Sequence, residues 1–217
     1  MIREIGKENT VFNRFLSELR DVEIQKDRMR FRRNMERVGE IFAYEISKMF
    51  SYAETEIVTP LGIAHMKLPV EKPVLATILR AGLPLHQGLL NFFDDSDSAY
   101  ASAYRKYTKD EDFIIKLDYV SAPSLEGKTL IISDPMLATG GSLVAALKGL
   151  MVNGEPKHIH IVTLLASEEG ILKLKRHFSL KPFTLWVGAI DDELTAKAYI
   201  VPGLGDAGDL AFGQKED

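Results

Sequence analysis

The sequence TLIISDPMLATGGS at residues 129–142 decides the fold. It begins with a short apolar run, passes through an aspartate, and ends in Thr-Gly-Gly-Ser. A run of this kind, bounded by turn residues, is typical of a strand that is buried on both faces. The residues at 143–152 predict a helix directly after the loop. Strand, Gly-rich loop and helix in this order favour a parallel α/β sheet.

Three similar apolar runs occur elsewhere in the chain, at 74–79, 159–165 and 183–187. A second helical pattern at 168–177 separates the last two runs. Short buried strands that alternate with helices indicate parallel strands covered on both faces. We therefore predict an α/β fold with a mostly parallel sheet flanked by helices.

Other segments do not follow this alternation. Residues 104–119 mix Tyr, Lys and acidic residues around Phe-Ile-Ile, which predicts an antiparallel excursion or a mobile arm. The stretches 10–20 and 27–50 carry apolar stripes at helical spacing. These patterns add a helical N-terminal segment to the α/β core, and the Gly-rich end of the chain adds a C-terminal cap.

Composition and charge exclude several classes of protein. The 217 residues include 27 Lys and Arg against 31 Asp and Glu, so the net charge is −4. That balance argues against a protein that covers nucleic acid or an anionic membrane. The absence of Cys excludes disulfide scaffolds, thiol catalysis and thiolate metal sites. The sequence contains no run that resembles a signal peptide or a membrane span, which predicts a cytoplasmic protein.

The loop at 134–142 is a candidate phosphate site. Its glycines, the hydroxyls of Thr139 and Ser142, and the N-terminus of the following helix suit an anion. Asp134 stands at the carboxyl end of a strand, where open α/β sheets bind ligands. The alternative is an ordinary strand-to-helix turn with Ser142 as the N-cap. A Walker loop is excluded because Gly-Lys-Ser/Thr is absent from this segment.

Arg80 is a second candidate for phosphate binding. It follows the apolar run at 74–79 directly, and Gly82 comes two residues later. A guanidinium at the carboxyl end of a strand can bind phosphate oxygens in a bidentate manner. If both strands belong to one parallel sheet, Arg80 and Asp134 face the same cleft.

The C-terminal sequence YIVPGLGDAGD at 199–209 meets the G-x-G-x-x-G dinucleotide pattern through Gly203, Gly205 and Gly208. That interpretation fails on geometry, because the fingerprint needs a following helix, a second strand and an acidic residue about twenty positions later. The sequence ends at Asp217. The segment can instead wrap a flat ligand with backbone donors and acceptors, or form a structural turn.

The predicted helix at 27–50 is rich in arginine, with Arg28, Arg30, Arg32, Arg33 and Arg37. Such a face is usually solvated or forms a contact between subunits. RNA binding is the alternative.

Together, residues 134–142 and 199–209 resemble the uracil phosphoribosyltransferase family. The segment 78–82 and the Tyr104-Arg105 pair fall in the family's order and spacing. The resemblance covers residues 10–213 and implies the type I phosphoribosyltransferase fold.

The resemblance also implies how the chain is organised. It predicts a single phosphoribosyltransferase domain over 1–217. Within it, 10–50 form the helical N-terminal segment, 74–190 the core, and 191–217 a Gly-rich hood that binds the base.

The reaction implied is pyrimidine salvage, in which uracil and 5-phosphoribosyl 1-diphosphate give UMP and diphosphate. The resemblance also implies Mg²⁺, bound mainly through the diphosphate, and we assign no protein ligand to this metal. By resemblance, Asp134, Arg80, Arg105 and Asp206 are the catalytic candidates, and Ile200, Gly205, Asp206 and Ala207 bind uracil. The residues expected to bind phosphoribosyl diphosphate are Arg80, Arg105, Asp134, Pro135, Met136, Leu137, Ala138, Thr139, Gly140, Gly141, Ser142 and Asp206.

Related phosphoribosyltransferases carry acidic residues where this chain has Pro135 and Ala138. Ala138 cannot act as a general base, so we expect positioning and electrostatics to dominate catalysis. The expected partners are the two substrates, a second copy of the chain in a homodimer or larger homo-oligomer, and GTP as a candidate activator. We expect no binding to nucleic acid or membrane. Two alternatives stay open: a pyrimidine-sensing RNA-binding regulator on the same fold, and a phosphoribosyltransferase for another base, such as a purine.

Overall fold

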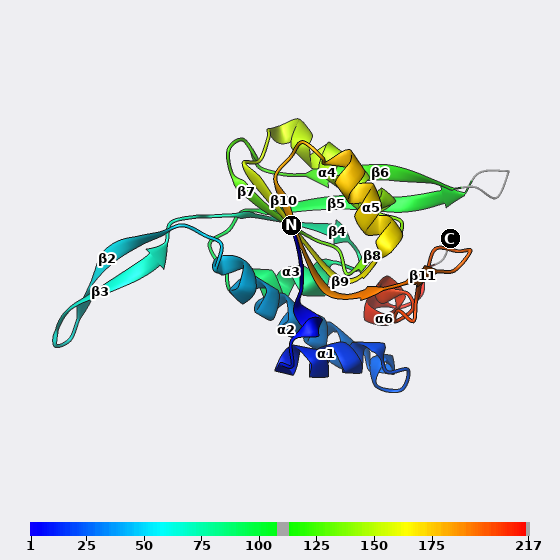
Figure 1. The fold of residues 1–217 in the computed structure, drawn as a ribbon, viewed down its shortest axis with the longest axis horizontal. Helices are drawn as coiled ribbons and strands as arrows, with labels where there is room; N and C mark the ends of the chain where they lie inside the picture. Colours follow the sequence, from blue (N-terminus) through cyan, green and yellow to red (C-terminus); the bar gives the residue numbers. More distant parts are fainter. Residues whose placement is uncertain (108–112, 216–217) are drawn as a thin grey trace.

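A central sheet with helices on both faces forms the body of the molecule (Figure 1). The computed structural model describes residues 1–107 and 113–215. Within them the main sheet has eight strands in the order β1-β10-β9-β7-β4-β5-β6, with β8 beside β9. Its strands are β1 (Ile2–Glu4), β4 (Val74–Leu79), β5 (Ser98–Tyr107), β6 (Phe113–Ser121), β7 (Thr129–Ser133), β8 (Met136–Leu137), β9 (His158–Ser167) and β10 (Phe183–Asp191).

The remaining elements lie around this sheet. The α-helices are α1 (Val11–Arg20), α2 (Arg28–Ser47), α3 (Leu83–Leu90), α4 (Gly141–Leu150), α5 (Glu168–His177) and α6 (Ala207–Phe212). Short 3₁₀ turns occupy Ile5–Lys7, Ile24–Lys26 and Met151–Asn153. Two small antiparallel sheets pair β2 (Tyr52–Thr59) with β3 (Gly62–Pro69), and β11 (Glu193–Leu194) with β12 (Ile200–Val201).

The strand pairing confirms the predicted α/β class. The four apolar runs form β4, β7, β9 and β10, and each pairs with its neighbours in parallel. The β5 and β6 strands pair antiparallel, as the excursion at 104–119 predicted. Residues 108–112 lie outside the described part of the chain.

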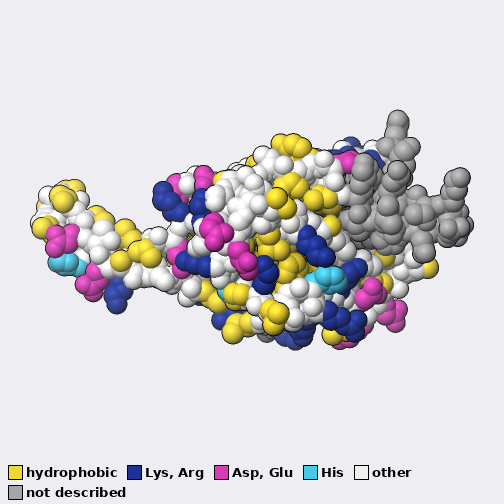
Figure 2. Space-filling view, turned by 90° about the horizontal axis from the view of Figure 1, so that it is seen from above, with side chains coloured by type: hydrophobic (Ala, Val, Ile, Leu, Met, Phe, Trp, Pro, Cys, Tyr) yellow, Lys and Arg dark blue, Asp and Glu magenta, His cyan; other side chains and the backbone are white. Residues whose placement is uncertain are grey.

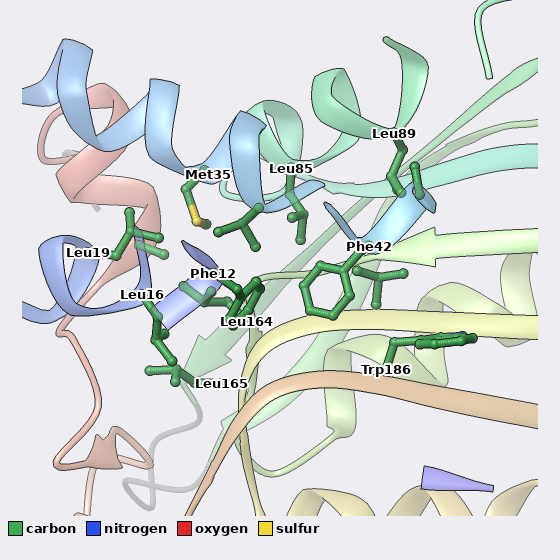
Figure 3. Packing of buried hydrophobic residues seen from close by; sticks show 14 of the residues in the cluster. Phe12, Leu16, Leu19, Met35, Phe42, Leu85, Leu89, Leu164, Leu165 and Trp186 are labelled. Atoms are coloured by element: carbon green, nitrogen blue, oxygen red, sulfur yellow. The ribbon is translucent and has the colours of Figure 1, made fainter. Parts of the chain in front are cut away.

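Alternate side chains of the strands enter two separate cores because successive residues point to opposite faces of a sheet. Leu75, Ile131 and Val162 pack with α1, α2 and α3 on one face. Figure 3 shows this packing, in which Phe12 lies beside Leu164, and the Phe12 and Phe42 rings meet edge to face at a centroid distance of 5.6 Å. Ala76 and Ile132 point to the other face, where α4 and α5 cover them.

The N-terminal helices begin after residues that cap them. Thr10 Oγ1 accepts a hydrogen bond from the Phe12 N–H, and Asp27 Oδ1 accepts from the Met29 and Arg30 N–H groups. Each such cap contributes about 1 kcal/mol to stability. The helices α1 and α2 match the predicted segments 10–20 and 27–50. No helix in the described ranges is long and apolar enough to cross a bilayer.

The β2–β3 hairpin extends away from the body of the molecule (Figures 1 and 2). Several of its apolar side chains face solvent, among them Val58 and Leu61, and Leu61 is fully exposed. The sequence analysis did not predict this element.

Candidate active site

The site lies where the topology of the sheet reverses. From β4 the chain continues through α3 to β5 on one side, and from β7 through α4 to β9 on the other. In open α/β sheets, ligands bind at the carboxyl ends of such a pair of strands. Arg80 follows β4 and Asp134 follows β7, so the two candidate phosphate elements emerge side by side.

Hydrogen bonds between side chain and backbone hold these strand ends together. Thr77 Oγ1 donates to the Ser133 carbonyl at 3.2 Å, and Ser133 Oγ donates to the Ala76 carbonyl at 3.2 Å. All three residues are buried. The spacing between the Arg80 segment and the Asp134 segment is therefore fixed by the core rather than by the loops.

The phosphate loop, residues 134–142, runs into the first turn of α4. Gly140 is the N-cap residue with φ +73°, and no side chain caps the helix. The alternative in which Ser142 is the N-cap is therefore wrong: the helix begins at Gly141, and Ser142 lies within its first turn. The first N–H groups of an α-helix have no partner inside the helix, and they are typical donors to phosphate.

A buried serine and a glycine support the phosphate loop from behind. Ser167 Oγ donates to the Ala138 carbonyl at 2.6 Å and accepts from the Gly170 N–H at 3.0 Å. Gly170 lies so close that a Cβ there would stand 2.4 Å from the Ala138 carbonyl oxygen. The sequence analysis missed both residues. Ser before Glu-Glu-Gly could have been read as a helix N-cap, but nothing local shows which loop it contacts.

Asp134 lies partly buried at the start of the phosphate loop. Its Oδ1 accepts a weak hydrogen bond from the Met136 N–H at 3.4 Å. Burial disfavours the charged carboxylate and raises the pKa of Asp134 to about 7. Next to it, the Pro135 carbonyl accepts from the N–H groups of Leu164 and Leu165, which fixes the loop on β9.

Arg80 connects the β4 end of the site to the C-terminal segment. Its Nη2 donates to Asp209 Oδ1 at 3.4 Å and to the Gly213 carbonyl at 3.3 Å. The side chain is 43% exposed, so it can exchange these long contacts for a ligand. The Leu79–Arg80 peptide bond is cis.

The hood, residues 191–217, is described as far as residue 215 and lies beside α1 and α2 at the same end of the sheet (Figure 1). Ile200 and Ala207 are buried, whereas Gly205, with φ +96°, is exposed. Asp206 Oδ1 accepts from the Asp209 N–H at 3.0 Å and caps α6. The four predicted uracil contacts therefore lie on one short segment, from β12 to the first residue of α6.

The G-x-G-x-x-G pattern is not a dinucleotide fingerprint. The strand before it, β12, has two residues and pairs with β11 in a separate small sheet. The fingerprint requires a strand of the main parallel sheet at that position.

The Arg105 side chain lies outside the part of the chain whose side chains the structure describes. The backbone places Arg105 on β5, the neighbour of β4, at a position paired with Ile115 of β6. Its role in binding diphosphate stays a prediction.

Arginines of α2 make polar contacts within the chain. Arg30 pairs with Glu18 at 2.8 Å, Arg33 pairs with Glu36 at 2.7 Å, and Arg37 donates to Asn34. Arg32 donates to the Ala211 carbonyl of the hood at 2.7 Å. These contacts favour a structural role for the arginine-rich helix over RNA binding.

Comparisons with known proteins show the family to which the chain belongs. The family model described as uracil phosphoribosyltransferase matches residues 7–214. A uracil phosphoribosyltransferase from Porphyromonas gingivalis is 52% identical over 211 residues, which are 97% of each chain. One from Thermococcus gammatolerans is 38% identical over 201 residues, covering 91% of this chain and 87% of that one. The solved structure of the AQ2163 protein from Aquifex aeolicus superposes with a TM-score of 0.86 at 29% identity, covering 98% of both chains. The chain belongs to the uracil phosphoribosyltransferase family.

Proposed function

We propose that the chain transfers the phosphoribosyl group of phosphoribosyl diphosphate to N1 of uracil, giving UMP and diphosphate in pyrimidine salvage. The observation that carries this proposal is the meeting of three segments at one end of the sheet. Arg80 and the phosphate loop follow adjacent parallel strands, and the hood contacts Arg80 through Asp209 and Gly213. Family membership supports the same activity.

The proposed roles of the residues follow from their positions. The phosphate loop binds the 5′-phosphate and the ribose hydroxyls, with Asp134 beside the ribose. Arg80 and Arg105 bind the diphosphate. Ile200, Gly205, Asp206 and Ala207 bind uracil, largely through main-chain groups, and Asp206 also binds phosphoribosyl diphosphate. All of these assignments place substrate atoms at the carboxyl edge of the sheet, as in other open α/β proteins.

In the reaction, the bond from C1′ to the diphosphate oxygen breaks and the bond from uracil N1 to C1′ forms, while N1 loses its proton. Positive charge develops on the ribose and negative charge on the diphosphate. Arg80, as a preorganised cation, stabilises the leaving group. Ala138 offers no base, so catalysis rests on holding N1 and C1′ in line. The purine alternative differs only in which base the hood accepts.

We propose that Mg²⁺ reaches the site on the diphosphate. Within residues 1–107 and 113–215, no three His, Cys, Asp or Glu side chains form a group that could hold a metal ion. Asp134 places a carboxylate oxygen beside the phosphate loop, and Mg²⁺ is commonly bound by one or two carboxylates together with substrate phosphates. The donor set therefore fits a metal delivered by the substrate. When bound, Mg²⁺ supplies charge neutralisation on the leaving diphosphate.

The test is a chromatographic assay for UMP with purified protein, uracil, phosphoribosyl diphosphate and Mg²⁺. Cytosine, hypoxanthine and adenine are assayed in parallel, each with and without GTP. UMP from uracil alone is the expected result, and a higher rate with GTP would support GTP as an activator. A purine nucleotide as the main product would replace uracil by the purine alternative. Binding of phosphoribosyl diphosphate without any product would favour the regulator.

We also propose that the protein is a cytoplasmic homodimer or larger homo-oligomer, in which the whole chain acts as one domain. The support is the β2–β3 hairpin, a two-stranded sheet whose apolar side chains Val58, Leu61 and Ile63 are exposed. An isolated hairpin is marginally stable in water, and a second copy of the chain could cover these side chains. Light scattering is expected to give at least the dimer mass, and a monomer after Val58, Leu61 and Ile63 are all changed to Ser. A monomeric parent protein would contradict the proposal.

A further inference from the structure

A buried ion pair holds the hood at Gly203. Arg20, the last residue of α1, binds Asp191 at the end of β10 through two hydrogen bonds, Nη1 to Oδ2 at 2.8 Å and Nη2 to Oδ1 at 2.7 Å. The Asp191 side chain is 6% exposed and that of Arg20 is 22% exposed. Ion pairs at this depth are weakly screened, and removing one partner leaves the other charge buried.

Both backbone groups of Gly203 complete the same cluster. The Gly203 N–H donates to Asp191 Oδ2 at 2.9 Å, and its carbonyl accepts from Arg20 Nη1 at 3.1 Å. Gly203 has φ +58°, and a Cβ there would stand 2.0 Å from the Ile200 carbonyl oxygen. The cluster therefore fixes a turn that only glycine can form without strain.

This turn lies between the residues assigned to uracil. Ile200 precedes Gly203 by three residues, and Gly205, Asp206 and Ala207 follow it. Binding a flat base through main-chain groups requires those groups to be held in place before the base arrives, since ordering them on binding costs affinity.

A second contact from the N-terminal segment acts on the adjacent residue. With its amide nitrogen toward the hood, the Gln25 side chain donates to the Leu204 carbonyl at 2.9 Å and to the Leu19 carbonyl at 3.1 Å. The end of α1 and the segment after it thus hold two consecutive residues of the hood. Neither contact touches the phosphate loop or Arg80.

We propose that Arg20 and Asp191 are positioning residues that set the affinity for uracil by holding Gly203, and with it the main-chain groups on either side. The proposal rests on the assignment of the hood to uracil. It assigns a function to the N-terminal helix α1, from which no residue was predicted to contact a substrate. It also requires that the pair affect binding of phosphoribosyl diphosphate less than binding of uracil, since Asp206 and the contacts of Arg80 are the hood's links to that substrate.

The test compares Arg20→Gln with the parent protein by steady-state kinetics and hydrogen exchange. We expect KM for uracil to rise about tenfold or more, because the hood loses hydrogen bonds to a charged group. KM for phosphoribosyl diphosphate should stay within about twofold. Amide exchange should become faster in the peptide that spans 198–208.

The matched control is Arg30→Gln. Arg30 also makes two hydrogen bonds to a largely buried carboxylate, that of Glu18 on α1, but it does not contact the hood in the described residues. This variant should lower the melting temperature while leaving KM for uracil and exchange at 198–208 unchanged. If the Arg20→Gln protein does not fold, Arg20→Lys replaces it, because lysine keeps the charge but cannot bind Asp191 with a planar fork.

An unchanged KM for uracil in the Arg20 variant would overturn the proposal, as would equal increases in both KM values or the same increase in Arg30→Gln. Failure of the proposed function is a different outcome. It appears in the parent protein, as absence of UMP before any variant is compared.

Discussion

The ionised side chain of Asp134 destabilises the folded protein. Its carboxyl lies beside the phosphate loop in surroundings that raise its pKa to about 7, from an ordinary value of 3.8. Between these two pH values the folded protein holds a proton that the unfolded chain has released. The contribution of this group to stability therefore falls as the pH rises from about 4 to 7.

Replacing Asp134 by Asn should separate stability from activity. The amide keeps an acceptor for the Met136 N–H but carries no charge. We expect kcat/KM to fall about 100-fold or more, because in the proposed function the ribose loses the carboxylate beside it. At pH 8 the variant should be more stable than the parent by about 1–2 kcal/mol, a difference that shrinks toward pH 4.

Parallel melting curves and UMP assays over this pH range provide the measurement. Equal losses of melting temperature and activity in the Asn variant would contradict a role for Asp134 in the reaction.

Ser167 should affect one substrate more than the other. In Ser167→Ala the Ala138 carbonyl loses its donor and the Gly170 N–H loses its acceptor, which costs about 1–3 kcal/mol of stability. KM for phosphoribosyl diphosphate should rise severalfold, whereas KM for uracil should not change, because the contact supports the phosphate loop alone. Steady-state kinetics with each substrate varied in turn tests this.

Thr129→Val is the control for Ser167. In the parent protein the buried Thr129 hydroxyl donates a hydrogen bond to Glu71 at 2.6 Å, at the opposite end of the sheet from the site. The control should lower the melting temperature without changing either KM. A rise in KM for phosphoribosyl diphosphate in both variants would indicate a general loss of stability.

Residues within continuous motifs could be found from the sequence, whereas their supporting residues could not. Asp134 and Arg80 each follow an apolar run, and the fold brings them to adjacent strand ends. Arg20 and Asp191 are 171 residues apart, and no sequence pattern around either residue indicates that the two are paired. Such pairs become visible only when the topology is known.

At the scale of elements, α5 limits how far the phosphate loop can move. The first turn of α5 packs directly under the loop through Gly170. In Gly170→Ala the new Cβ would meet two backbone oxygens, of Ala138 at 2.4 Å and Leu137 at 2.8 Å, so the loop must shift. We expect KM for phosphoribosyl diphosphate to rise about tenfold or more, with about 1–3 kcal/mol lost in stability.

Glu169→Ala is the neighbouring control, because Glu169 is exposed on the same turn. Kinetics and thermal melting of the two variants measure the effect. An unaltered KM in Gly170→Ala would show that the loop tolerates displacement.

The elements that the sequence predicted are those with a strong burial pattern. Strands β4 and β7 are almost entirely buried, so each is a continuous apolar run. Strands β2 and β3 are exposed along most of their length, and no burial pattern marks them. Helix α3 begins with Leu-Pro and contains a glycine, which lowers its helix propensity. Its formation depends on packing against α2 rather than on its own sequence.

At the scale of the whole molecule, acid stability depends on how the N-terminal helices are joined. Glu18 on α1 accepts hydrogen bonds from Arg30 and Asn34 of α2, and these lower the pKa of Glu18 from 4.5 to about 2. The ionised form is therefore favoured by folding. Its contribution is complete above about pH 4.5 and is lost as the pH falls toward 2.

The Glu18→Gln variant should make the acid limb of the stability curve less steep. At pH 7 its melting temperature should lie below that of the parent, because Arg30 loses a charged partner. The two proteins should converge as the pH approaches 2. Thermal melting from pH 7 to pH 2.5 measures the difference. An offset that stays constant over this range would exclude a titrating Glu18.

The contact between Arg20 and Gly203 limits when the hood can be fixed while the chain is being synthesised. A ribosome delivers Arg20 well before the residues that it binds, because Asp191 and Gly203 follow it by 171 and 183 residues. The Arg20 guanidinium at the end of α1 therefore lacks these partners until nearly the entire sheet has been synthesised. Contacts of such long sequence separation form late in folding. A nascent chain can complete its central strands while still attached to the ribosome, but the hood is fixed only after Gly203 has been synthesised.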